Sequence, residues 1–380
     1  MIDFSLSAEQ DLIIETAKDF ANSHLLPGVM ERDDKSIFPI KEIQKLGELG
    51  FMGMMVPEKW GGSGLDTVSY TLAIEEISAV ELSTSTIMSV NNSLVCQVLM
   101  DWGNNLQKKK YLIPLASGKK LGAYSLSEPD SGSDARNMQT FAERDGDDYI
   151  INGTKNWVTS GENSDLVVFF CRTKRDSSTN GISAFIIDKS TPGLTVGKKE
   201  DKLGLRASDT CQLYFENCRL SKENRIGDEG QGFSIAMNAL GGGRIGIAAQ
   251  SVGLARSALE KAISYSKERE QFGKPISKFG AIQNKLADIA TNVQSARLLV
   301  WQAAYLKDKG RDYIKESSMA KLFASSTAMN AASECVQIHG GYGYMQEYGI
   351  ERLMRDAKVT EIYEGTSEIQ RLVISRELLK

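Results

Sequence analysis

The spacing of apolar positions changes twice along the 380 residues, and each change marks a different type of secondary structure. Up to about residue 120, apolar residues recur every three or four positions, which predicts helices. Residues 7–10 read Ser-Ala-Glu-Gln, the pattern of a capping box, and should begin the first helix. Residues 41–49 and 67–80 are also predicted helices, and the glycine cluster at 61–64 marks a loop between them.

Between residues 121 and 228 the apolar positions form short runs rich in β-branched and aromatic residues. These runs lie at 149–151, 166–170, 184–187, 194–196 and 212–215. Turn dipeptides separate or follow them, namely Asn152-Gly153, Asn180-Gly181 and Pro192-Gly193. This pattern predicts a compact antiparallel β domain rather than βαβ units.

Helical spacing returns after Gly232. An unbroken series of steps of four and three runs through Ile282, Leu286, Ile289, Val293, Ala296, Val300 and Ala303. Such a series gives one apolar stripe on a long helix, which suits a helix bundle or a subunit contact. The predicted fold is therefore α+β, with a helical domain at 1–120, a β domain at 121–228 and a helical domain at 229–380.

Composition narrows the class of protein without indicating an activity. Apolar residues make up 41% and charged residues 25%, as in ordinary globular proteins. The net charge of −4 gives no reason to expect a nucleic acid or an anionic membrane as a partner, and no apolar run is long enough to span a bilayer. The two histidines, His24 and His339, argue against a His-rich metal site.

Cysteine usage bears on the compartment. The five cysteines are scattered, odd in number and never spaced as C-x-x-C, which suggests buried thiols in a reducing compartment. The N-terminus does not read as a signal peptide. We therefore expect a bacterial cytoplasmic protein or the mature form of a mitochondrial matrix protein.

Several familiar catalytic motifs are absent from the sequence. No G-x-G-x-x-G follows a predicted strand, so a Rossmann nucleotide site is unsupported. There is also no P-loop pattern G-x-x-x-x-G-K and no G-x-S-x-G nucleophile elbow. A nucleotide cofactor would therefore be held by loops and helix ends elsewhere.

Two segments at the start of the β region are candidates for binding a cofactor. Ser127, Gly132 and Ser133 lie in a stretch of small residues whose N–H groups and hydroxyls can approach a phosphate or a flat ring, although ordinary loops have the same composition. Trp157 and Thr159 would share one face of a predicted strand. They can cover an aromatic cofactor, or they are a core tryptophan and a satisfied threonine.

Two further segments lie in the C-terminal helical region. Three glycines at 241–243 precede a helix-length stretch, and Arg244 would lie in an early turn, where the helix dipole requires that a cation have a partner. The segment 337–344 is rich in glycine and aromatic residues, and Glu364 follows it between two helical stretches. Taken alone, Glu364 is also compatible with a solvated carboxylate at a helix start.

Together these segments resemble the acyl-CoA dehydrogenase family over essentially the whole chain, with the short-chain (butyryl-CoA) members most similar. The resemblance implies a helical domain, a β domain and a C-terminal four-helix bundle, assembled as a homotetramer with FAD as cofactor. It implies FAD contacts by Tyr124, Leu126, Ser127, Gly132, Ser133, Trp157, Thr159, Thr366 and Glu368. Further FAD contacts from a neighbouring subunit are implied for Arg269, Phe272, Gln337 and Gly341.

The same resemblance implies that Glu364, in the sequence Tyr-Glu-Gly-Thr, is the catalytic base. It would remove the proton α to the thioester carbonyl while flavin N5 accepts the β-hydride, giving the 2-enoyl-CoA. In isovaleryl-type members the base instead precedes the arginine matched by Arg244. Here that position is Gly243, which has no side chain, so Glu364 occupies the one placement that is filled.

Substrate and partners follow from the resemblance as well. It implies acyl-CoA contacts by Asn91, Ser133, Gly243, Arg244, Gln250, Thr360 and Gly365. Gln250 and Thr360 would shorten the acyl pocket and favour a chain near C4, with small branched or alicyclic acyl groups as the alternative. Gly241 and Gly280 replace an Asp and a Gln that are usual in the family, so one CoA contact and one FAD contact are missing there.

The acceptor expected from the resemblance is an electron-transferring flavoprotein. An acyl-CoA oxidase, an enoyl-CoA reductase and a non-catalytic binding protein on the same fold stay open as alternatives. An oxidase would be reoxidised rapidly by oxygen, and a binding protein would lack the flavin absorbance band near 450 nm.

Overall fold

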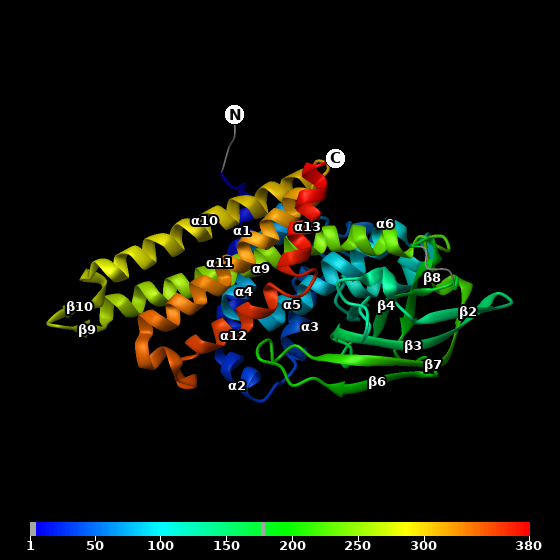
Figure 1. Ribbon diagram of the computed structural model, residues 1–380, viewed down its shortest axis with the longest axis horizontal. Helices are drawn as coiled ribbons and strands as arrows, with labels where there is room; N and C mark the ends of the chain where they lie inside the picture. The colour runs from blue at the N-terminus through cyan, green and yellow to red at the C-terminus, as the bar shows by residue number, and fades with distance from the viewer. Residues whose placement is uncertain (1–4, 176–178) are drawn as a thin grey trace.

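The computed structural model describes residues 5–175 and 179–380. A β region occupies one end of the molecule and long helices extend to the other end (Figure 1). The predicted capping box is present, because the Ser7 side chain accepts from the Gln10 N–H and the Gln10 side chain accepts from the Ser7 N–H. The N-terminal helices are α1 Ala8–Phe20, α2 Val29–Asp34, α3 Ile40–Glu48, α4 Thr67–Val80, α5 Leu82–Ser89, α6 Gln97–Trp102, α7 Asn105–Gln107 and α8 Ile113–Ala116.

The β region forms one sheet in the order β6-β7-β3-β2-β4-β5-β8, with β1 also paired to β4. Its strands are β1 Gly122–Ser125, β2 Phe141–Asp145, β3 Asp148–Thr159, β4 Leu166–Arg172, β5 Ile182–Asp188, β6 Leu194–Lys199, β7 Thr210–Ser221 and β8 Arg225–Ile226. Most pairs are antiparallel, as predicted. The prediction of an entirely antiparallel domain was wrong at β4, where β1 and β2 both pair in parallel. No tight turn joins either strand to β4, so the turn signals gave no information about these pairs.

Three long helices dominate the C-terminal region and pack on one another. Its elements are α9 Gly232–Glu268, β9 Glu270–Gln271, β10 Lys274–Pro275, α10 Gly280–Asp308, α11 Ile314–His339, α12 Ile350–Thr360 and α13 Ser367–Leu378. The predicted stripe on α10 is buried from Ile289 to Ala303, whereas Ile282 and Leu286 are partly buried at its beginning. The α+β prediction, with helical first and last regions and a β region between them, is confirmed.

Helix α9 begins where helical spacing returns in the sequence, so the expectation that the glycines at 241–243 precede a helix was wrong. It starts at Gly232, so the glycines at 241–243 and Arg244 lie well inside the helix rather than at its start. Glycine is unfavourable there by about 1 kcal/mol relative to alanine, and close packing explains why it is present. A β-carbon at Gly253, for example, would lie 2.2 Å from the backbone oxygen of Glu75 on α4. The two helices can approach this closely only because α9 carries glycine at the contact.

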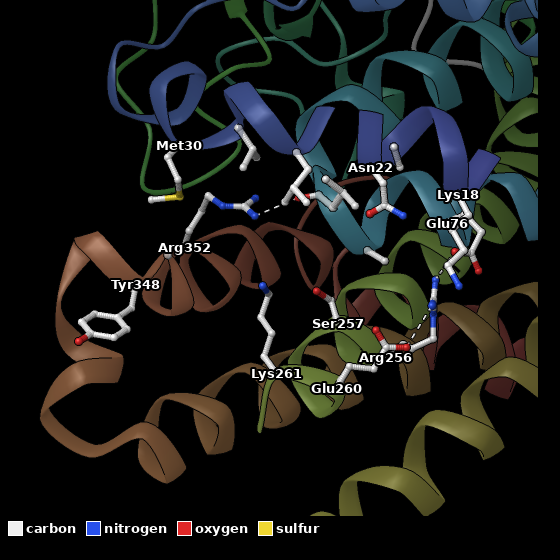
Figure 2. Close-up of a pocket in the computed structure, with 16 residues that line it drawn as sticks. Lys18, Asn22, Met30, Glu76, Arg256, Ser257, Glu260, Lys261, Tyr348 and Arg352 are labelled. Carbon is white, nitrogen blue, oxygen red and sulfur yellow. Dashed lines mark hydrogen bonds and ion pairs between the residues drawn. The ribbon is translucent and has the colours of Figure 1, made fainter. Parts of the chain in front are cut away.

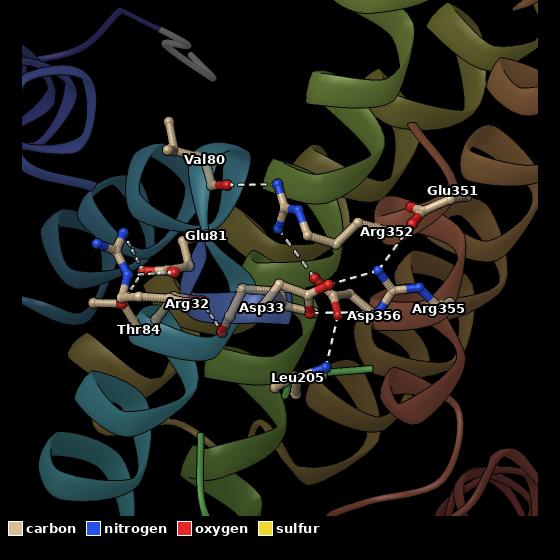
Figure 3. Close-up of polar contacts among 12 residues, drawn as sticks. Arg32, Asp33, Val80, Glu81, Thr84, Leu205, Glu351, Arg352, Arg355 and Asp356 are labelled. Carbon is tan, nitrogen blue, oxygen red and sulfur yellow. Dashed lines mark hydrogen bonds and ion pairs between the residues drawn. The ribbon is translucent and has the colours of Figure 1, made fainter. Parts of the chain in front are cut away.

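A buried polar network joins the three regions near the start of α12 (Figure 3). Asp356 accepts a 2.7 Å hydrogen bond from the backbone N–H of Leu205 in the β region and pairs with Arg352 on its own helix. Arg352 also donates to the carbonyl of Val80 at the end of α4. Arg355 forms an ion pair at 2.6 Å with Asp33 on α2. Helix α12 is thereby fixed to both other regions directly before the turn that carries Glu364.

All five cysteines are free and buried, as predicted. Within the two described ranges, none of the helices combines the length and the apolar character needed to cross a bilayer.

Candidate active site

Glu364 lies in the turn between α12 and α13. Its backbone is left-handed, with φ of 52°, and Gly365 follows with φ of 95°. A non-glycine residue in this region is strained by about 1–3 kcal/mol, so the surrounding structure must hold the turn in place. Lys321 Nζ and Gln370 Nε2 each donate to the Gly365 carbonyl at 2.8 Å. Thr366 then caps the first turn of α13 by accepting from the Ile369 N–H.

The Glu364 carboxylate points at the backbone of α9. An ideal β-carbon on Gly243 would lie only 2.1 Å from Glu364 Oε2, so any side chain at 243 would occupy the position of this oxygen. The residue as a whole is partly exposed, but Oε2 itself is buried and has no hydrogen-bond partner among the described residues. A buried carboxylate oxygen without a partner is costly, which indicates a functional rather than a structural role.

The electrostatic surroundings make Glu364 a usable base near neutral pH. Burial raises the pKa of its carboxyl from the usual range to about 7, and the positive charges of Lys321 and Arg244 act in the opposite direction. A general base is most effective when its pKa lies close to the working pH. The negative charge of Glu364 also contributes, after burial, to the raised pKa of Tyr124 on β1. The carboxylate therefore lies close to the segment predicted to hold the flavin.

Arg244 is buried beside this carboxylate. Its Nη1 donates to Ser318 Oγ on α11 at 3.3 Å, while its Nε is buried without a partner in the described part of the chain. The expectation that Arg244 needs a partner is met by Ser318 and by the charge of Glu364. The stated reason was wrong, because Arg244 does not lie in an early turn of α9.

Gln250 and Thr360 are both fully buried, and Gln250 is hydrogen-bonded to the residue before Glu364. Gln250 Oε1 accepts a 3.1 Å hydrogen bond from the Tyr363 hydroxyl, and its Nε2 donates to Ser85 and Thr86 on α5. The Thr360 hydroxyl donates to the carbonyl of Ala357 within α12. Both side chains are thus held by hydrogen bonds, and their place in an acyl pocket stays a prediction.

The two segments predicted to hold the flavin are joined by a buried ion pair. Lys155 Nζ on β3 lies 2.8 Å from Glu128 Oε1 and donates to the Leu126 carbonyl at 3.0 Å. The Ser127 carbonyl accepts from the Asn156 N–H at 2.8 Å. These contacts fix the loop that follows β1 against β3, so Leu126 and Ser127 have a defined backbone position.

Trp157 is exposed over 61% of its surface, so the alternative that it is a core tryptophan is wrong. Its φ is 58°, and the pairing of β3 with β7 shifts register between Lys155 and Val158. This bulge breaks the alternation on which a shared face with Thr159 was predicted. The loop at Gly132 and Ser133 is exposed as well, and no atom lies within 4 Å of where a Gly132 β-carbon would be. The indole and this loop both leave room for a planar aromatic cofactor.

The four residues assigned to a neighbouring subunit lie at the other end of the molecule. Arg269 ends α9, and Phe272 is 94% exposed beside the β9–β10 hairpin, which projects away from the β region (Figure 1). Gln337 and Gly341 are exposed at the end of α11. Arg269 and Gly341 line a shared cavity of about 400 Å³ there. These residues cannot reach the Trp157 surface of their own chain, so a flavin contact requires a second subunit.

The remaining predicted residues differ in how well they fit their roles. Asn91 is buried, donates to the carbonyls of Met52 and Leu115 and accepts from the Gly122 N–H, so its amide has a structural function and a substrate contact stays a prediction. Glu368 is exposed in the first turn of α13. A β-carbon at Gly241 would lie 2.7 Å from Ile314 Cδ1, and the space beside Gly280 is open.

Lys321 was not identified from the sequence. It is completely buried on α11 and bonds the Gly365 carbonyl next to Glu364. A signal was present, because Ser317, Ala324 and Ala328 lie on the same face at helical spacing. A lysine within a stripe of small buried residues requires a partner and so marks a candidate site.

A further cavity of about 360 Å³ lies between the N-terminal helices and helices α9 and α12 (Figure 2). It is lined by none of the predicted site residues. Arg256 in its wall pairs with Glu76 at 2.8 Å, and Arg352 belongs to the network in Figure 3. Its charged groups are thus largely used within the chain.

Comparison with known families covers nearly the whole sequence. Residues 7–119 match the N-terminal domain of acyl-CoA dehydrogenase, residues 123–218 its middle domain and residues 230–379 its C-terminal domain. The chain is 50% identical to an acyl-CoA dehydrogenase of Bacillus subtilis, covering 98% of this chain and 99% of that protein. It is 48% identical to the mitochondrial short-chain specific acyl-CoA dehydrogenase of Rattus norvegicus, covering 99% and 91%.

Solved structures agree with this comparison. Butyryl-CoA dehydrogenase from Megasphaera elsdenii superposes with a TM-score of 0.98 at 44% identity, over 100% of both chains. A chain in the structure of the electron transferring flavoprotein of Acidaminococcus fermentans gives 0.99 at 49% identity, also over 100% of both. A glutaryl-CoA dehydrogenase from Mycobacterium smegmatis in complex with FADH2 gives 0.93 at 33% identity, over 98% and 95%. Its bound flavin agrees with the cofactor predicted from the sequence. The chain therefore belongs to the acyl-CoA dehydrogenase family of enzymes, with short-chain specific members among its relatives.

Proposed function

We propose that this enzyme oxidises a short-chain acyl-CoA to the 2-enoyl-CoA, with Glu364 removing the α-proton. The observation that carries the proposal is the buried, unpartnered Oε2 of Glu364, aimed at Gly243 on α9, where no side chain stands in its way. A carboxyl whose pKa is raised to about 7 is suited to accept a proton from carbon.

The turn also supplies a donor for the charge that develops on the thioester oxygen. The backbone N–H of Glu364 has no acceptor within the described residues, so it is free to donate to that oxygen. A fixed N–H donor is worth roughly 3–4 kcal/mol of transition-state stabilisation when the reacting oxygen becomes negative. The strained backbone of Glu364 thus places both the base and a donor at one position.

FAD, when bound, accepts the hydride that leaves the β-carbon. The residues that would hold it are the loop around Ser127 and Gly132 and the exposed face of Trp157, with Thr366 near the base. The buried pair Lys155–Glu128 fixes the loop and strand that carry these groups. Arg269, Phe272, Gln337 and Gly341 would reach the cofactor from a neighbouring subunit, which supports a homotetramer.

The substrate proposed is a short acyl chain, because Gln250, bonded to Tyr363, and buried Thr360 would shorten the acyl pocket. Butyryl-CoA dehydrogenase among the structural neighbours supports the same size class. Arg244 and Gly365 would contact the acyl-CoA beside the base. Gly241 stands where the family usually has an Asp, so the CoA contact of that side chain is missing.

An electron-transferring flavoprotein is proposed as the electron acceptor, and a structure concerned with such a flavoprotein contains a similar chain. Relatives come from bacteria and from mitochondria, which supports the bacterial cytoplasm or the mitochondrial matrix as the compartment.

The test is an anaerobic titration of the FAD-loaded enzyme with linear, branched and alicyclic acyl-CoAs from C4 to C8. Butyryl-CoA should bleach the flavin band near 450 nm most completely, and octanoyl-CoA should bleach it least, because Gln250 and Thr360 close the pocket. Stronger bleaching by octanoyl-CoA would contradict the pocket assignment. Rapid reoxidation by air without the flavoprotein acceptor would favour an oxidase.

A further inference from the structure

We propose that Lys321 is a positioning residue for the base: its ammonium group holds the Glu364–Gly365 turn and keeps the Glu364 carboxylate ionised. The inference deepens the proposed function and rests on Glu364 being the base. Lys321 does not contact the reacting atoms in this proposal. It acts on them through Glu364.

The first support is the burial of Lys321. Its side chain is 0% exposed, on the face of α11 formed by Ser317, Ala324 and Ala328. An ammonium group that is removed from water is unfavourable unless the charge is compensated. The buried charge of Lys321 therefore needs partners within the protein.

The second support is the hydrogen bond that Lys321 makes. Nζ donates to the Gly365 carbonyl at 2.8 Å, and this is the carbonyl directly after the strained Glu364. Gln370 donates to the same oxygen at 2.8 Å and to the Glu364 carbonyl at 3.3 Å. The turn is thus held by one charged and one neutral donor, and the charged one forms the stronger hydrogen bond.

The third support is the distribution of charge around the turn. Burial raises the pKa of Glu364 to about 7, and Lys321 is the larger of the two influences that lower it, with Arg244 second. Burial lowers the pKa of Lys321 to about 8, and Glu364 is the largest influence in the other direction. The other titratable groups facing this pair are Tyr70, Tyr124, Tyr363, Glu361 and Glu368.

The sign of the pH effect follows from these directions. Glu364 acts as a base only when deprotonated, so proton abstraction should increase as the pH rises through about 7. Lys321 keeps its charge below about 8. Without the ammonium group, the pKa of Glu364 should rise by about one unit or more, since a nearby opposite charge lowers a carboxyl pKa by roughly that amount. The increase in rate would then move to higher pH.

Arg244 does not replace Lys321 in this role. Its guanidinium bonds Ser318 and, among the described residues, makes no hydrogen bond to the Glu364–Gly365 turn. Lys321 combines a charge near the carboxylate with a direct bond to the turn.

The experiment measures the rate of flavin bleaching by butyryl-CoA against pH for the FAD-loaded wild type, Lys321→Met and Gln370→Leu. Lys321→Met should shift the midpoint upward by about one pH unit and reduce the rate at pH 7 by roughly ten-fold. Gln370→Leu removes the neutral donor, so it should slow the reaction at all pH values with an unchanged midpoint. Lys307→Met, at a partly buried lysine bonded to Thr67 and Gln97, should leave the midpoint unchanged.

An unshifted midpoint in Lys321→Met with a normal 450 nm flavin band would overturn the proposal. If that variant does not retain FAD, Lys321→Gln keeps a donor without the charge and gives the same test. Failure of the proposed function is distinguishable, because the wild type itself would then not be bleached by butyryl-CoA.

Discussion

The β-carbon that residue 243 lacks would lie 2.1 Å from Glu364 Oε2. A side chain at position 243 and the Glu364 side chain would therefore occupy the same space, so only one of the two positions can carry one. The adjacent glycine differs, since the nearest atom to a β-carbon at Gly242 is Lys307 Cε at 3.7 Å. Two neighbouring glycines thus have different functions within one helix.

Gly243→Ala should displace the Glu364 carboxylate and slow flavin bleaching by butyryl-CoA about 100-fold, because a misplacement of about 1 Å can cost that much in rate. Gly242→Ala is the matched control and should keep the wild-type rate. Stopped-flow absorbance at equal FAD content measures both. Equal rates for the two variants would mean that the carboxylate does not work from this position.

Single residues could be predicted from the sequence where a motif marks them. Glu364 and Gly243 were identified together, because the family places its base at one of these two positions. Glu364 fills one position, and Gly243 has no side chain at the other. Lys321 was missed, because its importance depends on a hydrogen bond to Gly365, which is far away in sequence. The raised pKa of Glu364 depends on its burial and on the positions of Lys321 and Arg244, which are distant in sequence.

At the scale of elements, the loop after β1 and strand β3 act as one unit. The pair Lys155–Glu128 is almost completely buried, and Glu128 also accepts from the backbone N–H groups of Gln139 and Thr140. Burial lowers the pKa of Lys155, and the charge of Glu128 opposes this. The carboxylate thereby accepts from two segments, strand β3 and the residues directly before β2.

Lys155→Met should destabilise the protein by about 3–5 kcal/mol, because it leaves Glu128 buried without its counter-charge. It should also weaken FAD retention, since the Leu126 carbonyl loses its donor. Lys120→Met is the control in the same region, where Lys120 and Asp188 form an exposed pair at 3.4 Å. That change should cost no more than about 1 kcal/mol. Denaturant unfolding and flavin release measure both effects, and equal costs would contradict the role of the buried pair.

Element types could be predicted, but their details depended on distant contacts. The capping box of α1 and the stripe on α10 are local patterns and were found correctly. The glycines at 241–243 were expected to precede a helix because glycine normally disfavours a helix interior. Contacts distant in sequence, such as that of Gly243 with the Glu364 carboxylate, explain why they lie inside α9. The bulge at Trp157 and the parallel pairing of β4 are set by partner strands and leave no local signal.

At the scale of the whole molecule, the predicted cofactor residues lie at two opposite ends. Trp157 belongs to the β region, and Phe272 lies beside the β9–β10 hairpin at the far end of the helices (Figure 1). The family resemblance implies one shared role for these residues, but no pattern along the chain indicates how far apart they lie. The Phe272 ring is 94% exposed and is therefore accessible for the proposed contact with another subunit.

Phe272→Asp should therefore lower both the oligomeric mass and the amount of bound FAD, although the change lies far from Glu364. Leu106→Asp, at an exposed leucine on α7, is the control and should alter neither. Light scattering coupled to gel filtration, with absorbance at 450 nm, records mass and flavin together. A Phe272→Asp protein of unchanged mass and full flavin content would contradict the subunit contact.

The role of Glu364 as base is tested most directly by Glu364→Gln, which keeps the size of the side chain and removes the proton acceptor. The FAD-loaded variant is mixed anaerobically with butyryl-CoA and followed at 450 nm, with the wild type in parallel. The account predicts an intact spectrum of bound FAD and almost no bleaching, whereas the wild type is bleached rapidly. Bleaching of Glu364→Gln at the wild-type rate would contradict it.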